Sequence, residues 1–268
     1  MSHPNGKGDC MILAIDIGNT NITLGGYDRD KLVLLSRMYT ARNKTSDEYA
    51  TGLLDLLRFH HISPEAFDGA VLSSVVPQLT QVFSRAVSLV VKKEPIIVGS
   101  AHYGGLKVEV LPISSLGADL IAGCVGALSK YPTPCIVADL GTATKLLVLD
   151  KNGYFSGCII APGVKISLDA LASSAALLPS ISFTKPEKVI GTNTVECMQS
   201  GSVYGTAAML DGLIRRIRNE LGADDVTVVA TGGYSKGIIP CCEEKLIFDE
   251  NLVLYGLKTI YDRSQADG

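Results

Sequence analysis

The sequence predicts an α/β fold that is built from two related halves. Short apolar runs rich in Ile, Val and Leu alternate with longer stretches of helical periodicity, which is typical of strands alternating with helices. The segment AIDIGNTNITLGGYD also matches a later segment, VADLGTATKLLVLD. Each is an apolar strand, then Asp-x-Gly with a polar turn, then a β-rich run. Such an internal repeat indicates two related subdomains.

In the first half, the expected elements follow one another at short intervals. The apolar run 12–15, which ends in Asp-x-Gly, predicts a buried strand that enters a tight turn. Ser46 is a suitable N-cap for a helix that extends to about His60. The other expected elements are strands at 21–27, 32–39, 69–74 and 94–98 and a helix at 77–91.

The second half starts again with an apolar strand, 135–139, that ends in Asp-x-Gly. The elements expected after it are strands at 145–150, 154–160 and 226–231, helices at 164–173 and within 194–221, and a C-terminal helix in LYGLKTIYD. We divide the chain into a first half, residues 11–130, and a second half, residues 131–262. Residues 1–10 are polar and Gly-rich, so we expect a flexible N-terminal extension, with the globular pattern beginning at Met11.

The composition excludes several classes of partner. Hydrophobic residues make up 47% of the chain and charged residues 19%, and the formal net charge is −3. Because Lys and Arg are scattered, we expect no nucleic-acid partner and no anionic membrane surface. No apolar run reaches the ~18 residues of a membrane span, and no signal peptide is visible, so we expect a cytoplasmic protein. The cysteines form no CxxC pair, which favours free thiols buried in runs such as CIVADL and GCIIAPG.

The first Asp-x-Gly motif, DIGNTN, can bind an anion and a metal. Gly18 permits a tight turn and a close approach to the backbone. Backbone N–H groups and the side chains of Asn19, Thr20 and Asn21 can surround a phosphate. Asp16, at a strand end, can hold Mg²⁺ directly or through water. Taken alone, however, the motif is better explained as a β-hairpin turn rich in Asn and Gly.

The second motif, DLGTAT, places a carboxylate and two hydroxyls after a buried strand, on Asp139, Thr142 and Thr144. Its repetition of the first motif favours phosphate binding at both over two unrelated turns. Two facing copies would place two phosphate-binding hairpins on opposite walls of a cleft.

Four shorter segments each have a structural and a functional explanation. TGG at 231–233 either makes a strand-to-helix turn or lets a nucleobase or ribose lie against its glycines. In the GAD segment, Asp119 is either an acidic residue at a helix N-terminus or a general base for a substrate hydroxyl, and the pattern alone favours the former. APG at 161–163 bounds a site or makes a turn, and Asn193 or Thr194 caps a long helix.

Together these motifs resemble those of the type III pantothenate kinases. They occur in that family's order, as IDIGNTN, LGAD, ADLGTAT, IIAPG, GTNTVECMQSG and ATGG, between about Met11 and Tyr261. One such motif would be weak evidence for the family, whereas all of them in the same order are specific to it. The resemblance implies an actin-like fold with two duplicated ribonuclease H-like halves around a nucleotide cleft. It implies ATP-dependent phosphorylation of pantothenate to 4'-phosphopantothenate, the first step of coenzyme A biosynthesis, by a homodimer.

The resemblance also implies roles for particular residues. Asp119 would be the catalytic base, Asp139 would lie at the site of a monovalent cation, K⁺ or NH₄⁺, and Asp16 would hold Mg²⁺ through the phosphates. The residues expected to bind ATP are Asp16, Ile17, Gly18, Asn19, Thr20, Asn21, Ile22, Thr23 and Thr142. The residues expected to bind pantothenate are Gly117, Ala118, Asp119, Leu120 and Thr194.

The sequence departs from the family at Leu120 and Lys145. The family usually has Gly-Ala-Asp-Arg where this chain has Leu120, and Thr-Ala-Thr-Thr where it has Lys145. The residues expected to bind the ATP phosphates match the family pattern, whereas the residues expected near the acceptor substrate differ from it. Two alternatives therefore stay open: a related kinase for another small hydroxyl substrate, and a non-catalytic nucleotide-binding regulatory homologue, like the proteins named Bvg accessory factors.

Overall fold

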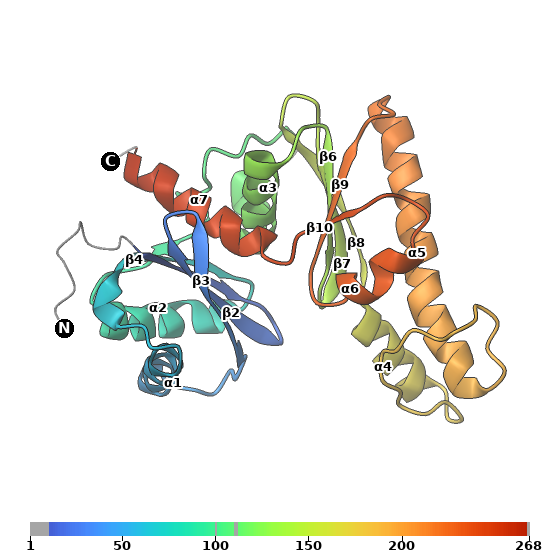
Figure 1. Cartoon of the computed structure of the whole chain (residues 1–268), viewed down its shortest axis with the longest axis horizontal. Helices are drawn as coiled ribbons and strands as arrows, with labels where there is room; N and C mark the ends of the chain where they lie inside the picture. The colour runs from blue at the N-terminus through green and yellow to red at the C-terminus, as the bar shows by residue number, and fades with distance from the viewer. Residues whose placement is uncertain (1–10, 100, 110–111, 267–268) are drawn as a thin grey trace, which may run out of the picture. The chain divides into compact units, whose positions relative to one another are not determined.

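The fold consists of two compact units, each built on one five-stranded sheet (Figure 1). The computed structural model describes residues 11–99, 101–109 and 112–266. The predicted N-terminal extension, residues 1–10, lies outside the described residues.

Neither unit is one continuous segment of the sequence. The first comprises residues up to 106, 111–129 and those from 253 onward, and the second comprises 107–110 and 130–252. Nearly all of the C-terminal helix α7 (Leu252–Ala266) therefore packs with the first unit. The predicted boundaries of the halves, 11–130 and 131–262, and the predicted cleft between them stay predictions.

The first sheet has the strand order β3-β2-β1-β4-β5. Its strands are β1 (Met11–Ile17), β2 (Asn21–Asp28), β3 (Lys31–Tyr39), β4 (Phe67–Ser74) and β5 (Ile96–Ile97). β1 is antiparallel to β2 and parallel to β4. Helices α1 (Ser46–Phe59) and α2 (Pro77–Val91) lie on one face, where they form a core with Leu13 and Ile15 of β1 (Figure 1). Because side chains alternate along a strand, Asp16 faces the other side of the sheet.

The second sheet repeats this topology strand for strand, in the order β10-β9-β6-β7-β8. Its strands are β6 (Cys135–Leu140), β7 (Ala143–Leu149), β8 (Phe155–Pro162), β9 (Thr227–Thr231) and β10 (Ile247–Phe248). β6 is antiparallel to β7 and parallel to β9, as β1 is to β2 and β4. Helices α4 (Val164–Ser174) and α5 (Thr194–Leu221) share a core with Ala138 and Leu140 of β6. The predicted α/β fold with two related halves is confirmed.

Helices α3 and α7 lie side by side in the first unit (Figure 1). A β-carbon on Gly256 of α7 would come within 2.7 Å of the Ala122 carbonyl carbon of α3 (Ala118–Lys130), so this glycine allows the two backbones to approach. The remaining short elements are α6 (Ser235–Ile238) and 3₁₀ turns at Pro64–Ala66, Ile113–Ser115 and Ile239–Cys241. No helix in the described part of the chain combines the length and apolarity needed to cross a membrane.

Three local expectations are wrong. Thr45, not Ser46, caps α1, because its backbone N–H donates to the Glu48 carboxylate at 2.8 Å while its Oγ1 accepts the Glu48 N–H at 3.3 Å. The strand expected at 94–98 is only two residues long. Cys158, expected to be buried, is exposed because β8 is an edge strand of its sheet.

Candidate active site

The first Asp-x-Gly motif forms the tip of the β1–β2 hairpin. The Gly18 N–H donates to the Asn21 carbonyl oxygen at 3.0 Å, and a β-carbon on Gly18 would crowd that oxygen at 3.1 Å. Thr40, just after β3, fixes the turn from the side by donating its hydroxyl to the Gly18 carbonyl oxygen at 2.8 Å. Asn19, Thr20 and Asn21 are exposed at the tip. The hairpin therefore presents amide and hydroxyl groups on a fixed backbone, which is suited to binding an anion.

Asp16 lies behind this tip in a row of oxygen-bearing side chains. In the register of the sheet it is opposite Thr23 on β2 and Ser73 on β4. Ser73 Oγ is buried and has no hydrogen-bond partner among the described residues. Carboxylate and hydroxyl oxygens are ligands that suit Mg²⁺, which usually takes one or two carboxylates and completes its shell with phosphates and water. The residues therefore fit the predicted magnesium position.

Two members of this site were not found in the sequence. Ser73 comes from a strand that pairs with β1 only in the folded sheet. Arg42 lies after β3, and its Nη2 donates to Asn19 Oδ1 at 3.2 Å, which brings a guanidinium to the hairpin tip. Strand register places Ser73, and a side-chain hydrogen bond places Arg42, so the sequence alone contained no local pattern that indicates either residue.

The second motif forms the corresponding tip between β6 and β7. Asp139 is the penultimate residue of β6, as Asp16 is of β1, and Thr142 is exposed at the turn. Two glycines pack against this turn from other segments. A β-carbon on Gly163 would lie 2.7 Å from the Gly141 carbonyl oxygen, and one on Gly232, whose φ is +92°, would lie 2.7 Å from Asp139 Oδ1. The APG and TGG segments thus hold the second hairpin by close backbone contact.

Lys145 pairs with Asp139 directly. The two residues are opposite each other in the β6–β7 register, and Lys145 Nζ lies 3.0 Å from Asp139 Oδ2. Their side chains are only 15% and 19% exposed. The carboxylate predicted to hold a monovalent cation therefore already has a cation of the chain beside it. The residues present do not fit an added monovalent ion at Asp139 as well as they fit Mg²⁺ at Asp16.

Asp119 lies in the first turn of α3, which confirms the helix start in the GAD segment. The helix begins with the Ile121 N–H donating to the Gly117 carbonyl oxygen at 3.1 Å. Asp119 Oδ1 accepts the Leu120 N–H at 2.9 Å, and a β-carbon on Gly117 would lie 2.7 Å from Oδ1. The absence of a side chain at Gly117 therefore gives the carboxylate its space. Ala118 and Leu120 flank it and carry no charge.

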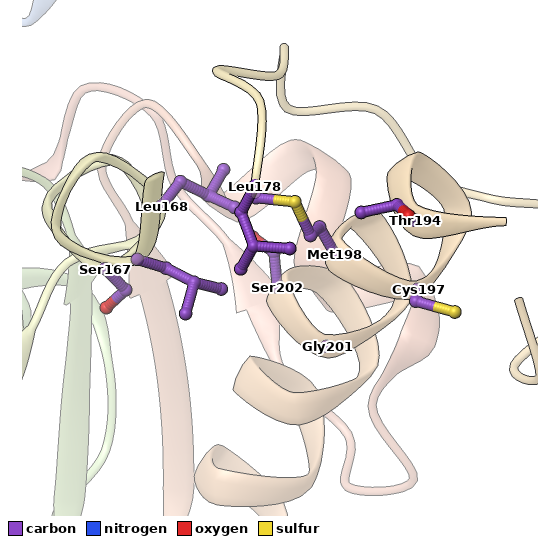
Figure 2. A pocket seen from close by; sticks show the side chains of 9 residues that line it. Ser167, Leu168, Leu178, Thr194, Cys197, Met198, Gly201 and Ser202 are labelled. Atoms are coloured by element: carbon purple, nitrogen blue, oxygen red, sulfur yellow. The ribbon is translucent and has the colours of Figure 1, made fainter. Parts of the chain in front are cut away.

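Thr194 lies at the start of α5, next to an apolar pocket of about 410 Å³ (Figure 2). The Asn193 side chain caps the helix by accepting the Glu196 N–H at 3.0 Å, and this fixes the position of Thr194. Figure 2 shows Leu168 of α4 facing Met198 of α5 across the pocket. The other lining residues are Ser167, Leu171, Leu178, Cys197, Gly201 and Ser202.

The predicted site residues are distributed over both units. Asp16 and Asp119 belong to the first unit, and Asp139, Thr142 and Thr194 to the second. Within the described residues, no three His, Cys, Asp or Glu side chains come together as a metal site.

The fold and the two hairpins define an α/β protein with an actin-like fold. A solved structure of a conserved Baf family protein from Campylobacter jejuni has a TM-score of 0.59 at 18% identity, covering 95% of this chain and 99% of that chain. The activator of the 2-hydroxyisocaproyl-CoA dehydratase from Clostridium difficile, with bound ADPNP, has a TM-score of 0.57 at 15% identity, covering 96% and 97%. These likenesses show the fold.

The chain belongs to the type III pantothenate kinase family. The sequence profile of that family matches residues 12–216. A type III pantothenate kinase from an Exiguobacterium species is 42% identical, over 95% of this chain and 100% of the relative. A type III pantothenate kinase from Shouchella clausii is 40% identical over the same shares of the two chains. The family that the ordered motifs predict is confirmed.

Proposed function

We propose that the protein transfers the γ-phosphoryl group of ATP to the primary hydroxyl of pantothenate, giving 4'-phosphopantothenate and ADP as the first step of coenzyme A biosynthesis. Membership of the type III pantothenate kinase family over nearly the whole chain supports this. The observation that carries it is the repeated Asp-x-Gly hairpin, with Asp16 and Asp139 at equivalent positions of two sheets of one topology. Because ATP is the phosphoryl donor, we assign the reaction to the cytoplasm.

The ATP phosphates would be bound at the first hairpin. Its backbone N–H groups and the side chains of Asn19, Thr20 and Asn21 can surround phosphate oxygens. Thr142, in the second hairpin, is likewise proposed to bind ATP through its hydroxyl. The Arg42 guanidinium adds a positive charge at the first tip. Asp16 and Ser73 would hold Mg²⁺, which when bound neutralises charge on the β- and γ-phosphates. Catalysis in such a site is mainly positioning and electrostatic stabilisation.

Asp119 would be the catalytic base. Its carboxylate is oriented by the hydrogen bond from the Leu120 N–H. The hydroxyl oxygen of pantothenate forms a bond to the γ-phosphorus while the bond to the β,γ-bridging oxygen breaks. The hydroxyl proton passes to Asp119 and the electron pair leaves with ADP. A base of this kind typically contributes about two to four decades in rate.

The acceptor would be bound by the start of α3 and the start of α5. Gly117, Ala118 and Leu120 surround Asp119, and Thr194 offers a hydroxyl beside an apolar pocket that suits the dimethyl end of pantothenate. Leu120 is the weak point of this assignment, because it cannot donate the charge-assisted hydrogen bonds of the usual family Arg. It is the observation that favours the second candidate function, a kinase for another small hydroxyl substrate.

A homodimer is part of the proposal. Among the described residues, seven of the thirteen exposed large hydrophobic side chains lie on β8, α4, the loop after it and the first turn of α5. They are Ile160, Ile166, Leu171, Leu177, Val189, Ile190 and Val195. Exposed large apolar side chains concentrated in a few elements are typical of an interface. Light scattering at micromolar concentration should give the mass of a dimer, and a fully active monomer would contradict this part.

Product analysis tests the proposed reaction. The purified protein is incubated with ATP, Mg²⁺ and pantothenate, and products are followed by ³¹P NMR and mass spectrometry. We expect one phosphopantothenate for each ADP formed. ADP formation only with a different hydroxyl acceptor would favour the second candidate, and nucleotide binding without turnover would favour a regulatory homologue.

A further inference from the structure

Asp139 and Lys145 form an ion pair that is largely enclosed by protein. Lys145 Nζ lies 3.0 Å from Asp139 Oδ2, with the two side chains 15% and 19% exposed. A β-carbon on Gly232 would lie 2.7 Å from the other carboxylate oxygen, Oδ1, so the backbone after β9 closes that side. An ion pair that is screened from water is coupled more strongly than one on the surface.

The internal repeat shows what is special about this pair. In the first unit the carboxylate of Asp16 is opposite Thr23 on the second strand of its hairpin. In the second unit the carboxylate of Asp139 is opposite Lys145 at the equivalent position. The residue paired with the carboxylate on the second strand is thus a neutral hydroxyl in the first hairpin and an ammonium group in the second. The two hairpins share a strand topology but differ in the charge beside the aspartate.

We propose that the Lys145 ammonium is a built-in replacement for a monovalent cation at Asp139, and that the protein therefore works without added K⁺ or NH₄⁺. A lysine ammonium is an alkylated NH₄⁺, with one positive charge and three hydrogen-bond donors. Because it is tethered to the neighbouring strand, it is present at high effective concentration. A free monovalent ion at the same carboxylate would have to displace it. This inference rests on the proposed function for its activity readout.

The first experiment measures turnover as a function of the cation. ATP-dependent phosphorylation of pantothenate is followed in KCl, in NH₄Cl and in tetramethylammonium chloride at equal ionic strength. For the unmodified protein we expect rates that agree within about twofold in all three salts. For Lys145→Thr we expect turnover to fall by about tenfold or more in tetramethylammonium chloride, since a charge-assisted contact is lost, and to recover at least in part with K⁺ or NH₄⁺.

The second experiment needs no activity. Thermal unfolding of the same proteins is measured in the same salts. We expect no K⁺-specific shift in Tm for the unmodified protein and a K⁺-specific rise for Lys145→Thr, because an ion that binds only the folded state stabilises it by mass action. Lys145→Met serves in place of Lys145→Thr if the latter does not fold. Lys165→Thr is the matched control, because Lys165 forms an exposed pair with Asp169 at 2.9 Å in the same unit.

The outcomes separate the inference from the proposed function. Dependence of the unmodified protein on K⁺, in turnover or in Tm, would overturn the inference, as would a Lys145→Thr variant that is indifferent to K⁺ in both measurements. A Lys165→Thr variant that gained K⁺ dependence would also overturn it, because the effect would then not be specific to Asp139. If no salt gives phosphopantothenate, the proposed function fails while the Tm measurement still decides the role of Lys145.

Discussion

Gly163 lies against the backbone of Thr142, and a β-carbon on Gly163 would come within 2.7 Å of the Thr142 carbonyl carbon. The end of β8 thus supports the turn of the second hairpin without an intervening side chain. Glycine is required at this position by space, because a methyl group would push the turn away.

Gly163→Ala should therefore raise KM for ATP by about tenfold or more. The added methyl group would displace the turn of the second hairpin, and a small displacement of a binding group weakens its contact with the substrate. Initial-rate kinetics at varied ATP measure this. Gly212→Ala on α5 is the control, because a β-carbon there meets nothing within 4 Å and alanine favours a helix. Equal KM values for the two variants would mean that the turn does not contact ATP.

Asp16→Ala should lower kcat with Mg-ATP by about two to three decades and leave the fold intact, because a residue that positions the metal and phosphates is lost. Steady-state kinetics and circular dichroism measure the two effects. Asp28→Ala, at the opposite end of the same hairpin, should keep normal turnover. Undiminished turnover in Asp16→Ala would remove Asp16 from the mechanism.

Asp119→Asn should lower kcat by about two decades or more, because it keeps the shape of the side chain and removes the base. KM for ATP should hardly change. Asp47→Asn is the matched control, since Asp47 is also an aspartate in the first turn of a helix. If Asp119→Asn behaves like Asp47→Asn, the residue only stabilises the start of α3 through the helix dipole.

Leu120→Arg should lower KM for pantothenate by about tenfold, the effect of one added charge-assisted hydrogen bond. Lys145 is already paired with Asp139, which argues against its substituting for the missing guanidinium. Kinetics at varied pantothenate measure the change, with Leu120→Gln to separate charge from size. An unchanged or higher KM in Leu120→Arg would show that another cation of the chain has taken over the role.

Glu196→Gln should make the protein less heat-stable at neutral pH, by about 1–3 °C in Tm. The hydrogen bond from the Thr192 N–H to the Glu196 carboxylate, with help from the Thr192 hydroxyl, lowers the pKa of Glu196 from its ordinary value of 4.5. A folded-state pKa below the unfolded one stabilises the fold above pH 4.5 and loses that contribution as the pH falls through the folded-state pKa.

The difference in Tm between Glu196→Gln and the unmodified protein should thus shrink in acid. Scanning calorimetry from neutral pH to below the ordinary pKa of a glutamate measures it. Glu220→Gln, in the last turn of the same helix, is the control and should show no such loss. A difference that is the same at every pH would contradict the role of the charge.

Helix ends were predictable from the sequence where a local signal fixes them. Pro77 begins α2 at the predicted residue, and Asn193, one of the two predicted caps, caps α5. The cap of α1 was misassigned by one residue, because Thr45 and Ser46 are both good caps and only the reciprocal bonds with Glu48 decide between them.

The site could be predicted only as far as its motifs reach. The two Asp-x-Gly turns and the start of α3 carry their own residue patterns, so the sequence indicated them. Ser73 beside Asp16 and Gly232 behind Asp139 come from segments that are distant in the sequence, whereas Lys145, opposite Asp139, comes from the next strand of the same hairpin. Such contacts depend on strand register and chain packing, which a single sequence does not reveal.

Helix α7 supplies contacts that the first unit cannot obtain from its own early residues. The Leu254 side chain fills the space above Gly25, and the Tyr261 ring lies against Gly69. Lys258 donates to Asp30 at 2.5 Å, which joins the last helix to the β2–β3 turn. During synthesis the ribosome therefore makes every residue of the second unit before it delivers the final part of the first. The first unit, although it contains the N-terminal strands, is therefore the last unit whose residues are all synthesised.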